Sequence, residues 1–412
     1  MSMAEPTIRV KPNNIAGMAD PVPILRRLQD GDPAHWSLED NGWLVTRYDD
    51  IKCGFHVRRL AVSRPMPPAE IFEVEFRDTY RAYASSLKTW MVIAEPPDHP
   101  RLRKLANRGL TPSAIEGLLP QIAELVDEFL AAMPELGDID FVKSFAYPLP
   151  ASVIALLIGL PKSVLGDLHR WSNDIAKGLG AAGEDIIRPP AHAAAEITAY
   201  LTEFIAARRK NPQDAIIDQL IAARDDDETV TTEELIGNLI LLLFAGHETT
   251  MNLLSNGLRT LFRNPGQIAD LRGNLGDTAV VAGTVEETLR HDGALFMLTR
   301  FAAQEFEWHG RHISKGKKIY LYCLAANHDA RKFADPDRFD IRRADSKQHL
   351  SFGYGPHFCL GGPLAWLEME VALPPLLRRY PGLSLPVGDV PWRNNMSLRG
   401  QPSMQLRLGE GV

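Results

Sequence analysis

The sequence contains few cysteines and no long apolar run. Its 412 residues include three cysteines, Cys53, Cys323 and Cys359, which are widely spaced and odd in number. This pattern excludes a disulfide framework and fits a reducing compartment. The longest apolar stretch, residues 239–245, is far too short to cross a bilayer. The first twenty residues carry neither an apolar signal segment nor a cleavage site, so we expect a soluble, cytoplasmic protein without a membrane anchor.

The sequence also lacks a surplus of basic charge. It has 45 lysines and arginines against 52 aspartates and glutamates, a formal net charge of −7. A chain of this balance has no overall attraction for nucleic acid or for an anionic membrane. The 45% hydrophobic and 24% charged composition is that of an ordinary globular protein. No repeat or clear boundary divides the chain, so we expect one domain over residues 1–412, or else a β-rich N-terminal part of residues 1–60 and an α-rich remainder.

Helical periodicity dominates the sequence. Apolar residues recur at spacings of three and four, with charges between them, in residues 114–133, 151–160, 193–209 and 278–290. Short strand-like runs lie between turn-forming residues, at 43–47, 318–324 and 404–408. The predicted class is mostly α with small β-sheets.

One predicted helix is much longer than the others. It begins at Thr231 or Thr232, where Thr231 and Glu234 match a capping box, and ends at the Arg-Asn-Pro sequence of residues 263–265. Its length is about 32 residues, or roughly 48 Å. The middle of this helix, LLLFAGHETT, changes abruptly from apolar to polar where burial is expected, and buried polar groups require a reason.

The segment around Cys359 has the composition of a cofactor-binding loop. Residues 352–361 read FGYGPHFCLG, in which Gly353 and Gly355 let the backbone bend and approach a flat ligand closely. A Gly-Gly-Pro sequence at 361–363 then signals a helix with proline in its first turn. Free amide groups and the helix dipole would therefore favour the thiolate of Cys359, which is the form that binds a metal.

The alternative for each cysteine is a buried structural thiol, which is the usual role of a lone cysteine. Cys53 and Cys323 lack the surroundings of Cys359, and we assign both of them to this structural role. For Cys359 we favour the metal ligand.

The cysteine loop resembles the haem-binding loop of the cytochrome P450 family, F-G-x-G-x-H-x-C-x-G. All six fixed positions are filled, by Phe352, Gly353, Gly355, His357, Cys359 and Gly361. The resemblance is to the soluble, bacterial type. It implies the cytochrome P450 fold, with haem b (iron protoporphyrin IX) held between a long distal helix and the helix that follows the cysteine loop. It also implies that Cys359 is the iron ligand and that Phe352 and Gly353 lie against the haem.

The middle of the long helix resembles a second pattern of the family. Residues 245–250, AGHETT, match its small residue, glycine, variable residue, acid and threonine. Gly246 would leave room for dioxygen and water, and Glu248 and Thr249 would pass protons inward as the catalytic pair. The alternatives are a surface acid for Glu248 and, for Thr249, a hydroxyl bonded to the preceding turn. His247 occupies the variable position and is interpreted as structural or pocket-lining.

A third match is the E-x-x-R motif, here Glu287 and Arg290, whose side chains lie three apart on one helix face. The resemblance implies that these residues form a buried structural network with a later arginine, which Arg338 in the segment 336–340 would supply.

Further residues resemble the positions that bind the haem propionates. Buried propionates need cationic or hydrogen-bonding partners, and the candidates here are His99, Arg103, Arg300 and His357. Solvated surface charge is the alternative. One departure from the family pattern is Trp366, which stands where an arginine is usual and would alter the proximal surface.

The resemblance implies a monooxygenase that activates O2 with two electrons and hydroxylates or O-dealkylates a small hydrophobic substrate. The substrate pocket would include Leu241, Phe244, Ala245, Phe296, Leu298, Ser397 and Leu398. Because Phe296 is bulky, we expect a compact or flat substrate, aromatic or terpenoid. No electron-transfer module is appended, so the implied partners of a monomer are a ferredoxin and a ferredoxin reductase.

Two rival functions remain at this point. One is a peroxide-driven haem peroxygenase, and the other is a non-catalytic haem-binding sensor or carrier. Neither needs a proton relay, so Glu248 and Thr249 argue against both.

Overall fold

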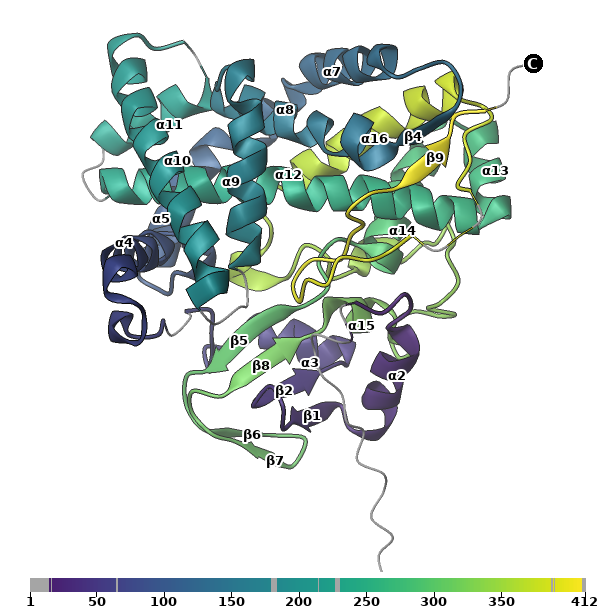
Figure 1. Ribbon diagram of the computed structural model, residues 1–412. Helices are drawn as coiled ribbons and strands as arrows, with labels where there is room; N and C mark the ends of the chain where they lie inside the picture. The colour runs from purple at the N-terminus through teal and green to yellow at the C-terminus, as the bar shows by residue number, and fades with distance from the viewer. Residues whose placement is uncertain are drawn as a thin grey trace, which may run out of the picture.

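The architecture is that of a large helical assembly beside a small mixed sheet (Figure 1). The computed structural model describes residues 15–409 except 16, 64, 65, 179–183, 214, 227–229, 387 and 389, so most of the N-terminal segment searched for a leader lies outside the described residues. The predicted class, mostly α with small sheets, is confirmed. No described helix is both long enough and apolar enough to cross a membrane.

Helices account for most of the described chain. They are α2 (Val22–Gly31), α3 (Tyr48–Gly54), α4 (Arg77–Lys88), α5 (Asp98–Gly109), α6 (Pro112–Glu116), α7 (Leu119–Ala132), α8 (Pro148–Ile158), α9 (Leu165–Lys177), α10 (Glu184–Lys210), α11 (Ile216–Asp226), α12 (Thr232–Arg263), α13 (Pro265–Gly273), α14 (Thr278–Asp292), α15 (Cys323–Asn327) and α16 (Gly362–Arg379).

The strands are short. They are β1 (Ala34–Ser37), β2 (Gly42–Val45), β3 (Leu60–Ala61), β4 (Asp138–Asp140), β5 (Leu298–Ala302), β6 (Phe306–Trp308), β7 (Arg311–Ile313), β8 (Lys318–Leu321) and β9 (Gln405–Arg407). Five of them form a sheet in the order β1-β2-β8-β5-β3, in which only β2 and β8 are parallel. The pairs β4-β9 and β6-β7 are separate two-stranded sheets.

The long helix α12 has the bounds that the sequence predicts. The Thr231 hydroxyl accepts a hydrogen bond from the Glu234 amide at 3.1 Å, and the Thr231 amide donates to the Glu234 carboxylate at 2.9 Å. These two bonds satisfy amides that would otherwise lack partners at the helix start. Asn264 and Pro265 end α12 and begin α13. Figure 1 shows α12 crossing the whole helical part, with α8, α9 and α10 packed against it.

The hydrophobic core has one large cluster among the helices and two smaller clusters around the sheet. The N-terminal strands β1, β2 and β3 complete their sheet only with β5 and β8, which lie far along the chain. A division near residue 60 would therefore cut through this sheet. The single domain over the whole chain stays a prediction.

Candidate active site

The cysteine loop has the local geometry that its sequence predicts. Gly353 and Gly355 adopt positive φ angles of 71° and 76°, a conformation that side chains disfavour. A Cβ atom at Gly355 would lie 3.1 Å from the Phe55 carbonyl oxygen, so the loop also needs glycine there for space. The Cys359 amide donates to the Phe352 carbonyl at 2.9 Å, which closes the loop. Helix α16 begins at Gly362 directly after it, with proline in its first turn.

Opposing influences act on the Cys359 thiol. Burial raises its pKa, whereas the amides of Gly361 and Gly362 and the charge of Arg103 act in the opposite direction. The helix-start amides therefore surround the sulfur as predicted, but they do not by themselves outweigh desolvation. A bound cation would complete the stabilisation of the thiolate, because a coordinated thiol is deprotonated.

The other two cysteines differ from each other. Cys323 is fully buried, as predicted for a structural thiol, and burial raises its pKa to about 12. Cys53 is exposed in α3, so the prediction of a buried structural thiol is wrong there. The helix turns one face to solvent and Cys53 lies on that face, while Ile51 and Gly54 are buried.

A cavity separates the cysteine loop from the middle of α12. Its wall includes ten of the predicted site residues: His99, Arg103, Leu241, Ala245, Thr249, Leu298, Phe352, Gly353, His357 and Cys359. Most of the remaining wall is apolar, with Leu253, Leu295 and Leu364 among its side chains. The Cys359 thiol and the polar turn of a buried helix thus line one hydrophobic space.

Basic groups lie in and behind the wall of this cavity, and none of them has an acidic partner among the described residues. Within the described chain, none of Arg103, Arg300, His99 and His357 forms an ion pair with a carboxylate, and the side chain of Arg103 donates to the Phe358 carbonyl at 2.7 Å. Burial lowers the pKa of Arg300 to about 10 and contributes most to lowering that of His357 to about 3. Arg300 does not line the cavity, but its charge acts on His357. A buried guanidinium is costly unless an anion pairs with it.

This arrangement fits haem b. The Cys359 thiol would bind the iron, the apolar walls would suit the faces of a flat macrocycle, and the basic groups would suit its two carboxylates. The rings of His99 and His357 lie 3.8 Å apart at the same place. Three of the four residues predicted to bind the propionates, His99, Arg103 and His357, therefore line the cavity, while the fourth, Arg300, lies behind its wall and acts on His357 through its charge.

The predicted catalytic pair on α12 points in two directions. Thr249 lines the cavity, and its hydroxyl donates to the Ala245 carbonyl at 2.8 Å, so the bond to the preceding turn and the cavity position occur together. Glu248 is only 4% exposed but does not line the cavity. Its carboxylate forms an ion pair with Arg393 at 2.5 Å. The alternative of a surface acid is therefore wrong for Glu248, but in the described structure Glu248 does not line the cavity.

Glycine is needed at position 246 for helix packing and not, as was predicted, to leave room for dioxygen and water. A Cβ atom at this position would lie 2.8 Å from the Cδ1 atom of Ile154 on α8. Glycine therefore allows α8 to approach α12 closely, and the space it leaves is filled by Ile154 rather than kept open. Both residues contribute to the cavity wall.

Several predicted pocket residues lie elsewhere. Phe296 is 1% exposed and packs edge-on against Tyr322, with ring centroids 5.5 Å apart, in the core beside the sheet. Its neighbour Leu295 lines the cavity instead. Phe244 is buried among the helices. Ser397 and Leu398 support the wall from behind, because the Ser397 carbonyl accepts from Phe296 and Leu398 bridges to Leu295.

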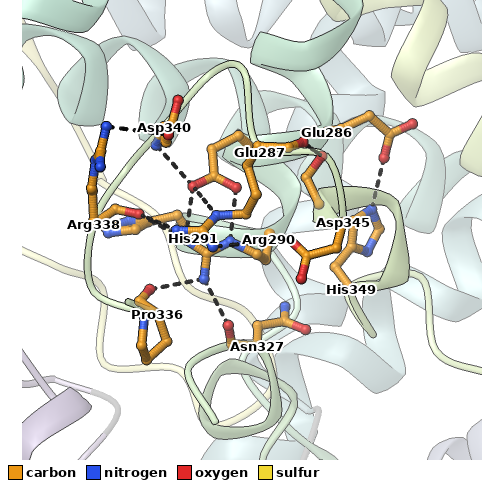
Figure 2. A network of polar contacts seen from close by, with 12 residues as sticks. Glu286, Glu287, Arg290, His291, Asn327, Pro336, Arg338, Asp340, Asp345 and His349 are labelled. Atoms are coloured by element: carbon orange, nitrogen blue, oxygen red, sulfur yellow. Dashed lines mark hydrogen bonds and ion pairs between the residues drawn. The ribbon is translucent and has the colours of Figure 1, made fainter. Parts of the chain in front are cut away.

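The E-x-x-R network is present, with one arginine different from the prediction. Arg290 and Glu287 are both fully buried and form two hydrogen bonds of 2.7 and 2.8 Å. Figure 2 shows the Arg290 guanidinium also facing the carbonyl groups of Asn327 and Pro336, at 2.8 Å each. The side chain of Arg338 instead faces outward, 64% exposed, toward Asp340.

Arg343 supplies the third charged group that Arg338 was expected to supply. Its Nε atom lies 3.2 Å from Oε1 of Glu287, and its side chain is 9% exposed. Arg338 contributes only its backbone carbonyl, which accepts from Arg290 at 3.2 Å and from Arg343 at 3.0 Å. Two arginines follow each other at 342 and 343, so the sequence contained the candidate but no signal to choose it.

Sequence reasoning missed two further carboxylate features. Arg393, the partner of Glu248, comes from a loop 145 residues away, and no local pattern connects them. Glu368 on α16 lines the cavity, is 1% exposed and leaves Oε2 without a partner in the described structure. Burial raises its pKa well above the usual value. The available signal was a glutamate nine residues after the cysteine predicted to bind the metal, on the inner face of a helix.

Trp366, the departure from the family pattern, has a hydrogen bond to helix α14 on the side of the cysteine loop away from the cavity wall of α12. Its indole Nε1 donates to Glu286 at 3.1 Å, and Glu286 in turn lies 3.4 Å from His349. Trp366 also lines a shallow groove with Phe358 and Pro363. The residue therefore does alter this surface, by placing an apolar ring there.

Replacing Arg300 by leucine tests whether the basic cluster exists for an anionic cofactor. We expect Arg300→Leu to release haem faster to a scavenging apoprotein, by about a hundredfold, because truncating one partner of a buried charge pair costs about 3 kcal/mol. The haem-free protein should be no less stable to urea, since its uncompensated guanidinium is gone. Equal haem loss from Arg300→Leu and from the exposed control Arg58→Leu would contradict the assignment.

Comparison with known proteins agrees over nearly the whole chain. The family model described as Cytochrome P450 matches residues 186–408. Cytochrome P450 107B1 of Saccharopolyspora erythraea is 36% identical over 374 residues, which cover 90% of each chain. Cytochrome P450 monooxygenase PikC of Streptomyces venezuelae is 35% identical, over 95% of this chain and 92% of that protein. The solved structure of cytochrome P450 PksS from Bacillus subtilis 168 matches with a TM-score of 0.86 and 31% identity, over 97% of this chain and all of the other.

Proposed function

Because the chain belongs to the cytochrome P450 family, we propose that its cavity hydroxylates or O-dealkylates a hydrophobic organic molecule with O2 and two electrons. Membership makes the chain a cytochrome P450 monooxygenase whose cofactor is haem b. The observation that carries the proposal is the single cavity that Cys359, Thr249 and an apolar wall share.

The residues around the cavity have separate roles in binding the cofactor and the substrate. Cys359 binds the iron, and Arg103, Arg300, His99 and His357 pair with the propionates. When bound, the haem supplies the iron that activates dioxygen and transfers one oxygen atom. Leu241, Ala245, Leu295 and Leu298 orient the substrate and exclude water from it.

Protons reach the cavity through α12. Thr249 lines the cavity, and in this structure its hydroxyl donates its single proton to the Ala245 carbonyl. To act in the relay, the hydroxyl turns away from Ala245 and donates that proton into the cavity. When the ion pair between Glu248 and Arg393 breaks, the protonated Glu248 side chain can turn to Thr249 and replace the proton that Thr249 has donated. Burial raises the pKa of Glu248, so its carboxyl group holds a proton more readily than an exposed glutamate would.

The substrate is proposed only as an apolar organic molecule. The expectation of a compact aromatic or terpenoid substrate depended on Phe296, which faces away from the cavity. Similar proteins carry names as different as 6-deoxyerythronolide B hydroxylase and vitamin D(3) 25-hydroxylase. These names support a hydrophobic substrate without fixing its size.

We also propose that a ferredoxin and its reductase supply the electrons. The cysteine loop approaches the surface at Phe358, which is 43% exposed, and this supports electron entry on that side. A cytoplasmic location is proposed from the free cysteines at 53, 323 and 359.

A compound library screened by the haem spin-state change, followed by product analysis, tests the proposed function. A ligand that gives an oxygenated product only with O2, ferredoxin, reductase and reduced nicotinamide supports a monooxygenase. Product formed equally well from peroxide alone would instead indicate a peroxygenase. Ligands that shift the spin state without any product would indicate a sensor or carrier.

Replacing Thr249 by alanine tests the proton relay. We expect Thr249→Ala to keep haem binding but to lower the fraction of electrons recovered in product by about tenfold, the rest appearing as peroxide or water. The matched control is Thr250→Ala, because Thr250 also lines the cavity and bonds to the Gly246 carbonyl at 3.2 Å. The relay assignment fails if Thr249→Ala recovers as large a fraction of its electrons in product as Thr250→Ala does.

A further inference from the structure

We propose that Tyr147 and His247 hold a water molecule beside Glu248, and that this water passes protons from the surface to the Glu248 carboxylate. The inference rests on the proposed function, since it supplies the relay of Glu248 and Thr249. It gives a role to His247, which the family pattern leaves variable, and to Tyr147, which no sequence motif contains.

Two buried polar atoms mark the position of the water. The hydroxyl of Tyr147 and the Nε2 atom of His247 are both buried and lack a hydrogen-bond partner in the described structure. The His247 Nδ1 atom lies 2.7 Å from the Leu243 carbonyl, so it must carry the proton and Nε2 is left as a bare acceptor. An unsatisfied buried polar group costs about 1–3 kcal/mol.

The two rings pack against each other, but their polar atoms form no direct hydrogen bond. Their centroids are 5.6 Å apart and their planes are nearly perpendicular, at 88°. A water needs two to four polar partners to occupy a buried position. The Tyr147 hydroxyl, the His247 Nε2 atom and the Glu248 carboxylate are three such partners. Glu248 is near enough for its charge to raise the pKa of Tyr147, although burial is the larger cause.

The ring of Tyr147 lies next to an exposed residue, although its hydroxyl is buried. Tyr147 lies at the junction between the π-helical turn Val142–Ala146 and α8, and its ring packs edge-on against the exposed His169 of α9 at 4.2 Å. Arg393, 29% exposed, forms an ion pair with Oε1 of Glu248, and its charge also acts on His169. The groups around Glu248 thus come from α8, α9, α12 and the C-terminal loop. We call Tyr147, His247 and the water between them the surface arm. In the proposed path, Glu248 connects this arm with Thr249, which lines the cavity.

The transfer balances in protons and moves no electrons. A proton that enters from solvent beside the exposed His169 binds the buried Tyr147 oxygen as the hydroxyl proton of Tyr147 passes to the water, and the water passes one of its protons to Glu248. Each oxygen of the arm ends with the protons it began with. Glu248 becomes a neutral acid, which weakens its ion pair with Arg393. The side chain is then free to turn toward Thr249.

Replacing Tyr147 by phenylalanine removes the hydroxyl and keeps the ring. The measurement is dioxygen consumption by the haem-loaded protein with ferredoxin, reductase and 7-ethoxycoumarin as the apolar probe, in H2O and in D2O. We expect Tyr147→Phe to slow consumption by about tenfold and to increase the solvent isotope effect. The matched control is Tyr200→Phe, a half-buried tyrosine that stacks on Phe204 away from Glu248 and should change neither value.

A double-mutant cycle with Glu248→Gln separates a proton path from a packing effect. If the arm acts through Glu248, the double variant should be no slower than Glu248→Gln alone, because serial steps are not additive. His247→Gln, which keeps a polar atom at a shifted position, should give a smaller slowing than Tyr147→Phe. An intact carbon monoxide spectrum in each variant shows that the haem site has folded.

An unchanged isotope effect in Tyr147→Phe, or rates that multiply in the double variant, would overturn the proposed arm. If Thr249→Ala still uncouples in that case, the relay stands and only the arm is wrong. If Thr249→Ala and Glu248→Gln both behave as the unmodified protein does, the proposed relay has failed and the arm fails with it.

Discussion

Cys359→Ser is expected to abolish the thiolate-type spectrum of the reduced carbon monoxide complex and to lower monooxygenase turnover by at least about 10³-fold, as loss of a residue that acts as part of a catalytic unit does. A serine oxygen in this loop is not acidic enough to become an anion beside the iron. The thiolate also donates electron density that favours cleavage of the O–O bond. The substitution is nearly isosteric, so the loop itself should persist.

Cys53→Ser and Cys323→Ser are the controls for this experiment. Cys53 is exposed and Cys323 is buried, so together they separate loss of the ligand from loss of any thiol and from burial of a hydroxyl. We expect both variants to keep the spectrum. Survival of the thiolate-type spectrum in Cys359→Ser would mean that another residue binds the iron, and its loss in Cys53→Ser would mean that the effect is indirect.

The features predicted correctly from the sequence are those with local causes. The start of α12 depends on two residues three apart, Thr231 and Glu234, and its end on the proline at 265, so both bounds could be read from the sequence. The bend of the cysteine loop depends on glycines that adopt positive φ, and those glycines are visible in the same way. The position of Thr249 beside the cavity was implied by the resemblance of residues 245–250 to the family pattern, and the burial of the helix alone would not have distinguished it from Glu248.

The wrong predictions occur where either of two similar neighbouring residues could have faced the site. Leu295 and Phe296 are adjacent and both apolar, and in an extended segment neighbours face opposite sides. Only the register set by the strand that follows decides which of them reaches the cavity. Burial gave no help, because Phe296 is as buried in the core beside the sheet as it would be in a pocket.

Partners that are distant in sequence could not be predicted either. Glu248 is neutralised by Arg393, which belongs to a loop rather than to a helix with a periodic pattern. Ion pairs of this kind depend on how the C-terminal chain returns across α12, and no spacing rule connects the two residues. The composition of the site was therefore predictable in its local motifs, while its electrostatic balance was not.

Arg343→Ala should destabilise the haem-loaded protein by about 3 kcal/mol, whereas Arg338→Ala should change its free energy of unfolding by less than about 0.5 kcal/mol. Removing Arg343 takes one of two cations from the buried Glu287 and leaves that carboxylate with Arg290 alone. It also removes donors to the carbonyl groups of residues 334, 335 and 338. Removing the Arg338 side chain breaks only an exposed ion pair of 3.3 Å with Asp340.

Urea unfolding of the two variants at equal haem occupancy measures this difference. The comparison is sharp because both are arginine-to-alanine changes five residues apart, and both residues have backbone or side-chain contacts with Arg290 or Glu287. Equal losses of stability would mean that the carbonyl of Arg338 and its local backbone, rather than the Arg343 charge, stabilise the network. A large loss in Arg338→Ala alone would restore the arginine that the family pattern implied and contradict the geometry around Glu287.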